Sequence, residues 1–233
     1  MTGAALRATR GLVRDFGEIQ QLQVSAKGPD KFSRAALARA ESILRVELSK
    51  ARPEFGFARA DDPPGKGEGE PRWLGGPLDG AANFAHGIPH FALSIAAISG
   101  AEITAGVIYD PLRDEMFRAE KGGGGYLNDG RLRVSARRRL EGAMLAASAA
   151  APEGLESASL RRLGSTSLDL AYVAAGRLEG CCCAAPNRWE VAAGSLLVRE
   201  CGGLVSTLGG NDIVAANGHL HDSLVAALGR PDG

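Results

Sequence analysis

The most constraining feature of the chain is a pair of apolar, β-branched runs at residues 91–99 and 103–110, joined by a turn at Gly100. This pattern predicts two consecutive β-strands. Two helical patterns precede them, at residues 2–23 and 33–51. The second has apolar residues at the spacing of one helix face: Ala36, Ala40, Ile43, Leu44 and Leu48.

Strands and helices also alternate in the second half. The patterns predict helices at about 167–175 and 189–201 and from His219 onward, and strands at about 178–184, 204–207 and 213–216. Further strands are expected at 55–57, 116–119 and 132–134, a flexible turn at Gly122–Gly125, and a polar loop at 58–72. Layered alternation without internal repeats favours a mixed α/β or α+β sandwich.

Composition limits the classes of function. The chain has 233 residues, with 27 basic and 27 acidic side chains, so nothing in its net charge favours nucleic acid or an anionic membrane. The Arg137–Arg139 run and the pair Arg161-Arg162 are interpreted as solvated faces. No apolar stretch is long enough to span a membrane, and the chain is expected to be cytoplasmic.

Three of the four cysteines are consecutive, Cys181 to Cys183, and no CxxC pair is present. Adjacent cysteines do not make a disulfide framework or a zinc site. They are interpreted as small apolar residues on a strand.

Two motifs carry a resemblance. Residues 73–91 read WLGGPLDGAANFAHGIPHF, and residues 189–194 read WEVAAG. They resemble the two signatures of the inositol monophosphatase family, W-I-x-D-P-[LI]-D-G-T-T-N-F-x-H-G-[IF]-P-x-[FV] and W-D-x-A-A-G. Other segments match in the same order, including 109–115, 128–135 and 168–180. The resemblance implies a layered α-β-α-β-α sandwich, formed by residues 1–233 as one domain with lobes at about 1–140 and 141–233.

The resemblance also implies a chemistry. The family hydrolyses phosphate monoesters of small polyols with Mg²⁺, a cation that requires several oxygen ligands. Its D-P-[LI]-D-G-T motif supplies two carboxylates, one backbone carbonyl and a threonine that positions the attacking water. A loop glutamate and the aspartate of W-D complete the metal site.

Several of these groups are missing here. The loop glutamate aligns with Ala60, the first aspartate with Gly76, the catalytic threonine with Ala81 and the next threonine with Ala82, while a second-helix acid aligns with Leu37. The remnant metal ligands are Asp79, Glu190 and the carbonyl of Leu78, and the remnant substrate pocket comprises Gly80, Ala81, Ser165 and Cys183.

Each remnant has a structural alternative. Asp79 is expected to cap a helix that begins near Ala81. The negative charge of Glu190 stabilises the start of a helix through the helix dipole, whether or not metal binds. The acids of the polar loop, Asp61, Asp62, Glu68 and Glu70, are interpreted as solvated, with a substitute metal-binding role left open.

The sequence therefore predicts a catalytically impaired or inactive pseudophosphatase, retained for binding or assembly. One alternative is a weakly active Mg²⁺-dependent phosphomonoesterase on inositol or sugar phosphates. Another is an interaction protein in a transcription or RNA-processing complex. Expected partners are a small phosphorylated polyol, a protein and a second copy of the chain, with direct nucleic-acid contact not expected. The 84–110 segment is expected to form either the homodimer interface or core.

Overall fold

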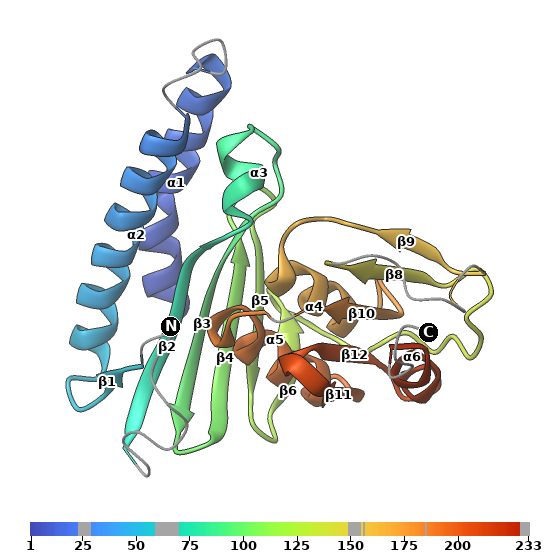
Figure 1. The fold of residues 1–233 in the computed structure, drawn as a ribbon. Helices are drawn as coiled ribbons and strands as arrows, with labels where there is room; N and C mark the ends of the chain where they lie inside the picture. Colours follow the sequence, from blue (N-terminus) through green and yellow to red (C-terminus); the bar gives the residue numbers. More distant parts are fainter. Residues whose placement is uncertain (23–28, 59–69, 149–154, 156, 185, 229–233) are drawn as a thin grey trace.

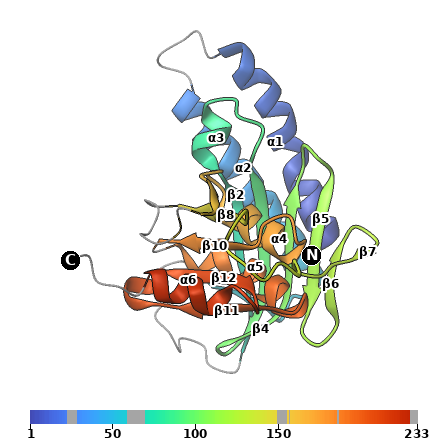
Figure 2. The ribbon, with the colours of Figure 1, turned by 90° about the vertical axis from the view of Figure 1, so that its right-hand side faces the viewer.

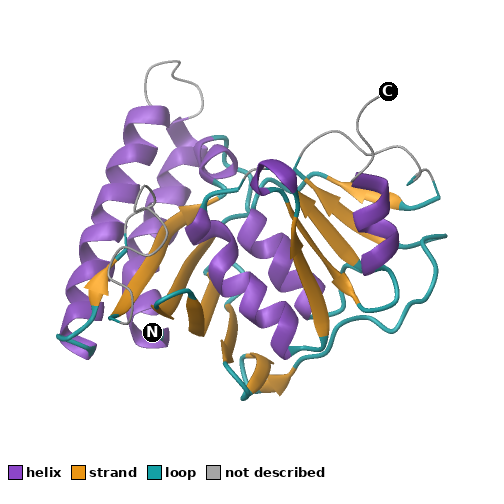
Figure 3. Cartoon of the chain, turned by 60° about the horizontal axis from the view of Figure 1, so that its bottom comes forward, coloured by secondary structure: helices purple, strands orange, loops and turns teal. Residues whose placement is uncertain are grey.

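The computed structural model describes residues 1–22, 29–58, 70–148, 155, 157–184 and 186–228. Five layers follow one another across the molecule: helices, sheet, helices, sheet and a last helix, as Figure 3 shows. The predicted α-β-α-β-α sandwich is confirmed. No helix in the described part of the chain has both the length and the apolar character to cross a membrane.

Within the described residues, the larger sheet has seven strands in chain order (Figure 1). All neighbours are antiparallel except the first pair. The strands are β1 (Gly56–Phe57), β2 (Pro71–Asp79), β3 (Ala92–Ser99), β4 (Glu102–Asp110), β5 (Glu115–Glu120), β6 (Gly124–Leu127) and β7 (Gly130–Arg131).

The smaller sheet has five strands within the same described ranges, in the order β11-β12-β10-β8-β9. Strand β10 pairs in parallel with β8 and antiparallel with β12. The strands are β8 (Met144–Ala147), β9 (Ser159–Arg161), β10 (Gly180–Cys183), β11 (Gly203–Thr207) and β12 (Ile213–Asn217).

Alternation along the strands of the larger sheet explains the first three layers. Val107 on β4 faces the helices α1 (Thr2–Leu22) and α2 (Pro29–Ala51), where it packs in one buried cluster with Ala8 and Leu48. The next residue, Ile108, points to the opposite face and packs in the central core. Successive strand residues therefore serve two helical layers.

The central core lies between the two sheets and contains helices α4 (Thr166–Ala174) and α5 (Arg188–Glu200). Cys181 and Cys183 on β10 face this core, and the four cysteines of the chain are free and buried. The interpretation of the cysteine run as small buried strand residues is confirmed. Helix α6 (His221–Leu228) covers the other face of the smaller sheet (Figure 2).

Two local expectations differ from the structure, and the third segment described here, 84–110, had two alternatives. Gly124 and Gly125 begin strand β6 instead of a flexible turn, because their backbone pairs with Glu120 and Ala119 of β5. Residues 132–134 form no strand and belong to neither sheet. The 84–110 segment is largely core, since β3 is buried along almost its whole length.

Candidate functional site

The two signature segments meet where β2 ends. Gly80 follows Asp79 with a left-handed φ of 83°, and the short helix α3 (Ala81–Ala85) begins there. Ser167 of α4 links this strand end to α5: its backbone N–H donates to Asp79 Oδ2 at 2.6 Å, and its hydroxyl donates to the Glu190 carbonyl at 3.1 Å. The prediction that the 76–81 segment lies beside the start of the helix carrying Glu190 is confirmed.

Trp189 occupies the space in front of Gly76. A Cβ added at Gly76 would lie 1.8 Å from Cε3 and 2.3 Å from Cζ3 of this indole. The ring is partly buried against the central core. In this arrangement an aspartate at position 76 and the indole cannot both be accommodated, so the structure fills the volume that the first metal ligand of the signature needs.

Asp79 is turned toward helix α4. It is 5% exposed, and its Oδ2 also accepts the Ser165 hydroxyl at 2.8 Å. Burial raises the pKa of this carboxyl, the hydrogen bonds from Ser167 and Ser165 oppose the rise, and the nearby charge of Glu190 adds to it.

The expectation that Asp79 caps the helix at Ala81 is wrong. The N-cap of α3 is Gly80, which makes no side-chain cap. The first residues of α3 are exposed, so water can satisfy their N–H groups, whereas Ser167 at the start of α4 is fully buried. Its N–H needs an acceptor from the protein, and Asp79 supplies it.

Glu190 is engaged by the start of its own helix. Its Oε2 accepts the backbone N–H of Asn187 at 2.9 Å, and its Oε1 accepts the Asn187 side-chain amide at 3.0 Å. Asn187 and Glu190 thereby form the capping box of α5. Both carboxylate oxygens of this remnant ligand already have donors.

The remaining predicted positions divide between surface and core. Ala81 and Ala82 are exposed, while Leu78 is buried in the cluster that joins α1, α2 and α3. Ser165 is buried as the N-cap of α4, and Cys183 is 2% exposed in the central core. The hydroxyl of Ser165 donates to Asp79 within the protein, and its place in a substrate pocket stays a prediction. Leu37 is partly buried on α2, and Ala60 lies outside the described residues.

Asp169 was not anticipated as part of the site. It is 3% exposed, its Oδ1 has no hydrogen-bond partner, and burial together with the Asp79 carboxylate raises its pKa to about 7. An acid within the otherwise apolar run Leu168–Val173 is the signal that marks it in the sequence.

These residues do not fit the magnesium cage of the family. Mg²⁺ requires converging oxygen ligands, but position 76 has no side chain and faces the indole, while Glu190 and Asp79 hold helix starts. Over the ranges that the structure describes, no group of three His, Cys, Asp or Glu side chains is arranged to hold a metal ion.

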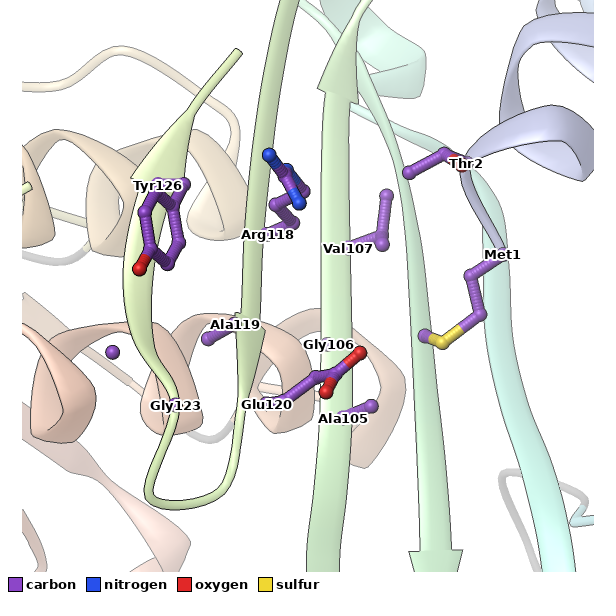
Figure 4. A pocket seen from close by; sticks show the side chains of 11 residues that line it. Met1, Thr2, Ala105, Gly106, Val107, Arg118, Ala119, Glu120, Gly123 and Tyr126 are labelled. Atoms are coloured by element: carbon purple, nitrogen blue, oxygen red, sulfur yellow. The ribbon is translucent and has the colours of Figure 1, made fainter. Parts of the chain in front are cut away.

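A separate cavity of about 440 Å³ lies on the outer face of the larger sheet (Figure 4). It is lined by Ala105, Gly106 and Val107 of β4, by Arg118, Ala119 and Glu120 of β5, by Gly123, Gly124 and Tyr126, and by Met1 and Thr2 of the first helix. None of the signature residues lines it.

The molecule is a five-layer sandwich in which the Asp79-Gly80 turn at the end of β2 lies near Trp189 and Glu190 at the start of α5. This arrangement defines the class of metal-dependent polyol-phosphate phosphatase folds. The chain belongs to the inositol monophosphatase family, whose model matches residues 2–230. It is 44% identical over 253 residues to an inositol-1-monophosphatase of Mesorhizobium japonicum, covering 99% of this chain and 95% of the relative.

Two further comparisons agree. The crystal structure of the extragenic suppressor protein suhB from Bartonella henselae superimposes with a TM-score of 0.84 at 42% identity, covering 99% of this chain and 97% of that one. A Pseudomonas aeruginosa protein called Nus factor SuhB is 37% identical over 248 residues, covering 94% of this chain and 90% of the relative.

Proposed function

We propose that this chain is an inositol monophosphatase family protein whose Mg²⁺-dependent hydrolysis is lost or strongly impaired, and that it is retained for binding or assembly. The observation that carries the proposal is the indole of Trp189 in the space that a side chain at Gly76 would need. A direct metal ligand is replaced there by a packed ring, and a smaller carboxylate count weakens the hold on a strongly hydrated cation.

Three other positions support the proposal. Ala81 has no hydroxyl to orient an attacking water, and orientation of the nucleophile contributes orders of magnitude to rate. Glu190 is held by Asn187 in a capping box, and Asp79 is held by α4. Each surviving carboxylate therefore has a structural task that does not depend on metal.

The main rival is a weakly active Mg²⁺-dependent phosphomonoesterase. The names of relatives such as the Mesorhizobium japonicum enzyme favour phosphatase chemistry. In this reading, acids of the polar loop supply the missing ligands; Asp61, Asp62 and Glu68 lie outside the described residues, and Glu70 is exposed.

Phosphate release from inositol 1-phosphate at millimolar Mg²⁺ distinguishes the impaired protein from the weakly active phosphomonoesterase. The Mesorhizobium japonicum relative serves as the positive control, and Asp222→Ala, at an exposed acid of α6, as the neutral variant. We expect wild-type release at the background level, unchanged by EDTA. Turnover that EDTA and Asp79→Ala both abolish, and that Asp222→Ala leaves intact, would establish the rival.

A second candidate role is assembly with the transcription machinery. It is favoured by the relatives named Nus factor SuhB, including the Pseudomonas aeruginosa protein. The test is affinity purification of the tagged chain from its source cell, with RNA polymerase subunits measured by mass spectrometry. Enrichment over an untagged control supports this role, and the absence of polymerase subunits from the purified material contradicts it.

A further inference from the structure

Two arginines flank a tyrosine on the outer face of the larger sheet. Tyr126 of β6 lies directly opposite Arg118 of β5 on one side and Arg131 of β7 on the other. Directly opposite residues project to the same face of a sheet. The guanidinium carbon of Arg118 lies 5.2 Å from the centre of the Tyr126 ring (Figure 4). Both arginines are exposed.

The basic character continues along the chain from this row. Residues 131–140 contain five arginines and no acid: Arg131, Arg133, Arg137, Arg138 and Arg139. All five are exposed. This segment, which we call the arginine segment (residues 131–139), begins at the end of β7 and continues into the connection to β8 of the smaller sheet.

The arginine segment is held in place by its backbone. The N–H of Leu132 donates to the Gly125 carbonyl at 2.8 Å, and that of Val134 donates to the Cys201 carbonyl at 3.1 Å. Farther along, the Asn217 amide donates to the Arg137 carbonyl at 3.1 Å. Leu132 and Val134 pack against the central core. The arginines are therefore presented from a backbone that is anchored at Leu132, Val134 and Arg137.

Most of this charge is not neutralised locally. Arg137 pairs with Glu179 at 3.5 Å. In the described portion of the chain, Arg131, Arg133, Arg138 and Arg139 form no ion pair. Exposed guanidinium groups without an ion-pair partner suit a polyanion, because each group can bind a phosphate through two parallel hydrogen bonds.

We propose that the Arg118–Tyr126–Arg131 row and the arginine segment bind single-stranded nucleic acid. A backbone-tracking line of cations together with an aromatic side chain on which a base stacks is the arrangement that such ligands require. The balanced net charge of the chain conceals this local excess. Binding of single-stranded nucleic acid goes beyond the proposed loss of hydrolysis. It does not depend on whether hydrolysis is lost.

An anionic membrane fits the same surface less well. Binding in a membrane interface requires exposed apolar side chains beside the cations. Within the described residues, none of the large exposed apolar side chains belongs to this row or to the arginine segment. A polyanion bound through phosphate contacts and stacking needs no such side chains.

The test is fluorescence anisotropy of a short labelled oligouridylate RNA titrated with the purified chain over a range of salt concentrations. Arg138→Ser/Arg139→Ser should weaken binding about tenfold at moderate salt and reduce the slope of log K against log[salt] by about 1.4, since each lost phosphate contact on a single strand removes about 0.7. Tyr126→Leu should weaken binding roughly five- to a hundredfold with the salt slope unchanged, because it removes stacking.

The matched control is Arg161→Ser/Arg162→Ser, which removes two adjacent exposed arginines at the end of β9. It should leave affinity and slope unchanged. Equal losses of RNA affinity in the two double variants would mean that only the net charge of the chain matters, and would overturn the proposal. It is also overturned if the wild-type chain does not bind the RNA, or if it binds vesicles of phosphatidylcholine and phosphatidylserine but not the RNA.

Discussion

Residue 76 shows how a position without a side chain is filled by a neighbour. The glycine leaves a space at the end of β2, and the Trp189 indole packs into it. The same tryptophan belongs to the second signature. A residue of the second signature thus fills the space beside a predicted ligand position of the first, and the sequence alone gives no sign of this because it depends on a side-chain rotamer.

We expect Gly76→Ala to lower the free energy of unfolding by about 1–3 kcal/mol, because its Cβ would overlap the indole. The control is Gly75→Ala on the same strand, whose Cβ would meet only Leu44 Cδ2 at 3.2 Å and the Ser94 carbonyl at 3.9 Å. Urea unfolding of both variants, alone and with Trp189→Ala, gives the coupling between positions 76 and 189. Equal stability of the two alanine variants would contradict the packing described here.

Asp169 gives a prediction about pH. Its pKa is raised from 3.8 to about 7 in the folded chain, so ionisation costs the folded state more than the unfolded state. The free energy of unfolding should therefore fall as the pH rises from about 4 to about 7, as this carboxyl loses its proton.

Asp169→Asn removes this penalty. Its stability relative to wild type should be greater at pH 8 than at pH 5 by roughly 1–3 kcal/mol, measured by urea unfolding. The contrast is Asp15→Asn, at a buried acid paired with Arg39 at 2.6 Å, which should destabilise the chain at both pH values. If Asp169→Asn gained the same stability at both pH values, ionisation of the Asp169 carboxyl would not be the cause of the gain.

At the scale of elements, Asp79 joins β2 to α4. Asp79→Ala should lower the free energy of unfolding by about 1–3 kcal/mol, since the buried N–H of Ser167 loses its acceptor. Asp79→Asn keeps an acceptor oxygen and should recover part of the loss. Thermal unfolding with and without MgCl₂ is the measurement. If Mg²⁺ stabilises the wild type and not Asp79→Ala, then Asp79 acts as a metal ligand and its structural assignment is wrong.

The long elements were predictable from local pattern. Helices α1, α2, α4 and α5 and strands β3 and β4 lie within a few residues of their predicted bounds, because their apolar periodicity extends over many residues. Strand β6 was missed because Gly124 and Gly125 have no side chains to carry such a pattern. Strands β8 and β9 are too short for a period to appear, and their pairing with β10 is set by tertiary contacts.

The candidate site was predictable in part. The signatures predict that a metal ligand is missing at Gly76 and a catalytic hydroxyl at Ala81, and both stay predictions. The hydrogen-bond partners of the remaining carboxylates were not all predictable, since Asp79 accepts hydrogen bonds from residues more than 80 positions away in the sequence. Glu190 is different: its capping partner is three residues away, and the N-x-x-E pattern at Asn187 is visible in the sequence.

At the scale of the whole molecule, we expect a homodimer. The prediction comes from the family resemblance. Most of the 84–110 segment is covered within the chain, but Ile88 in it remains 49% exposed. Multi-angle light scattering at micromolar concentration should give twice the 24.1 kDa chain mass. A monomer mass under these conditions would contradict the prediction.

The central claim is that the metal cage has been replaced by packing and helix caps, and calorimetric titration with Mg²⁺ tests it most directly. The Mesorhizobium japonicum relative, named an inositol-1-monophosphatase, is titrated in the same buffer for comparison. For this chain we predict no saturable heat at millimolar Mg²⁺, and no difference between the wild type and Asp79→Ala. Saturable binding in the wild type that Asp79→Ala abolishes would contradict the account.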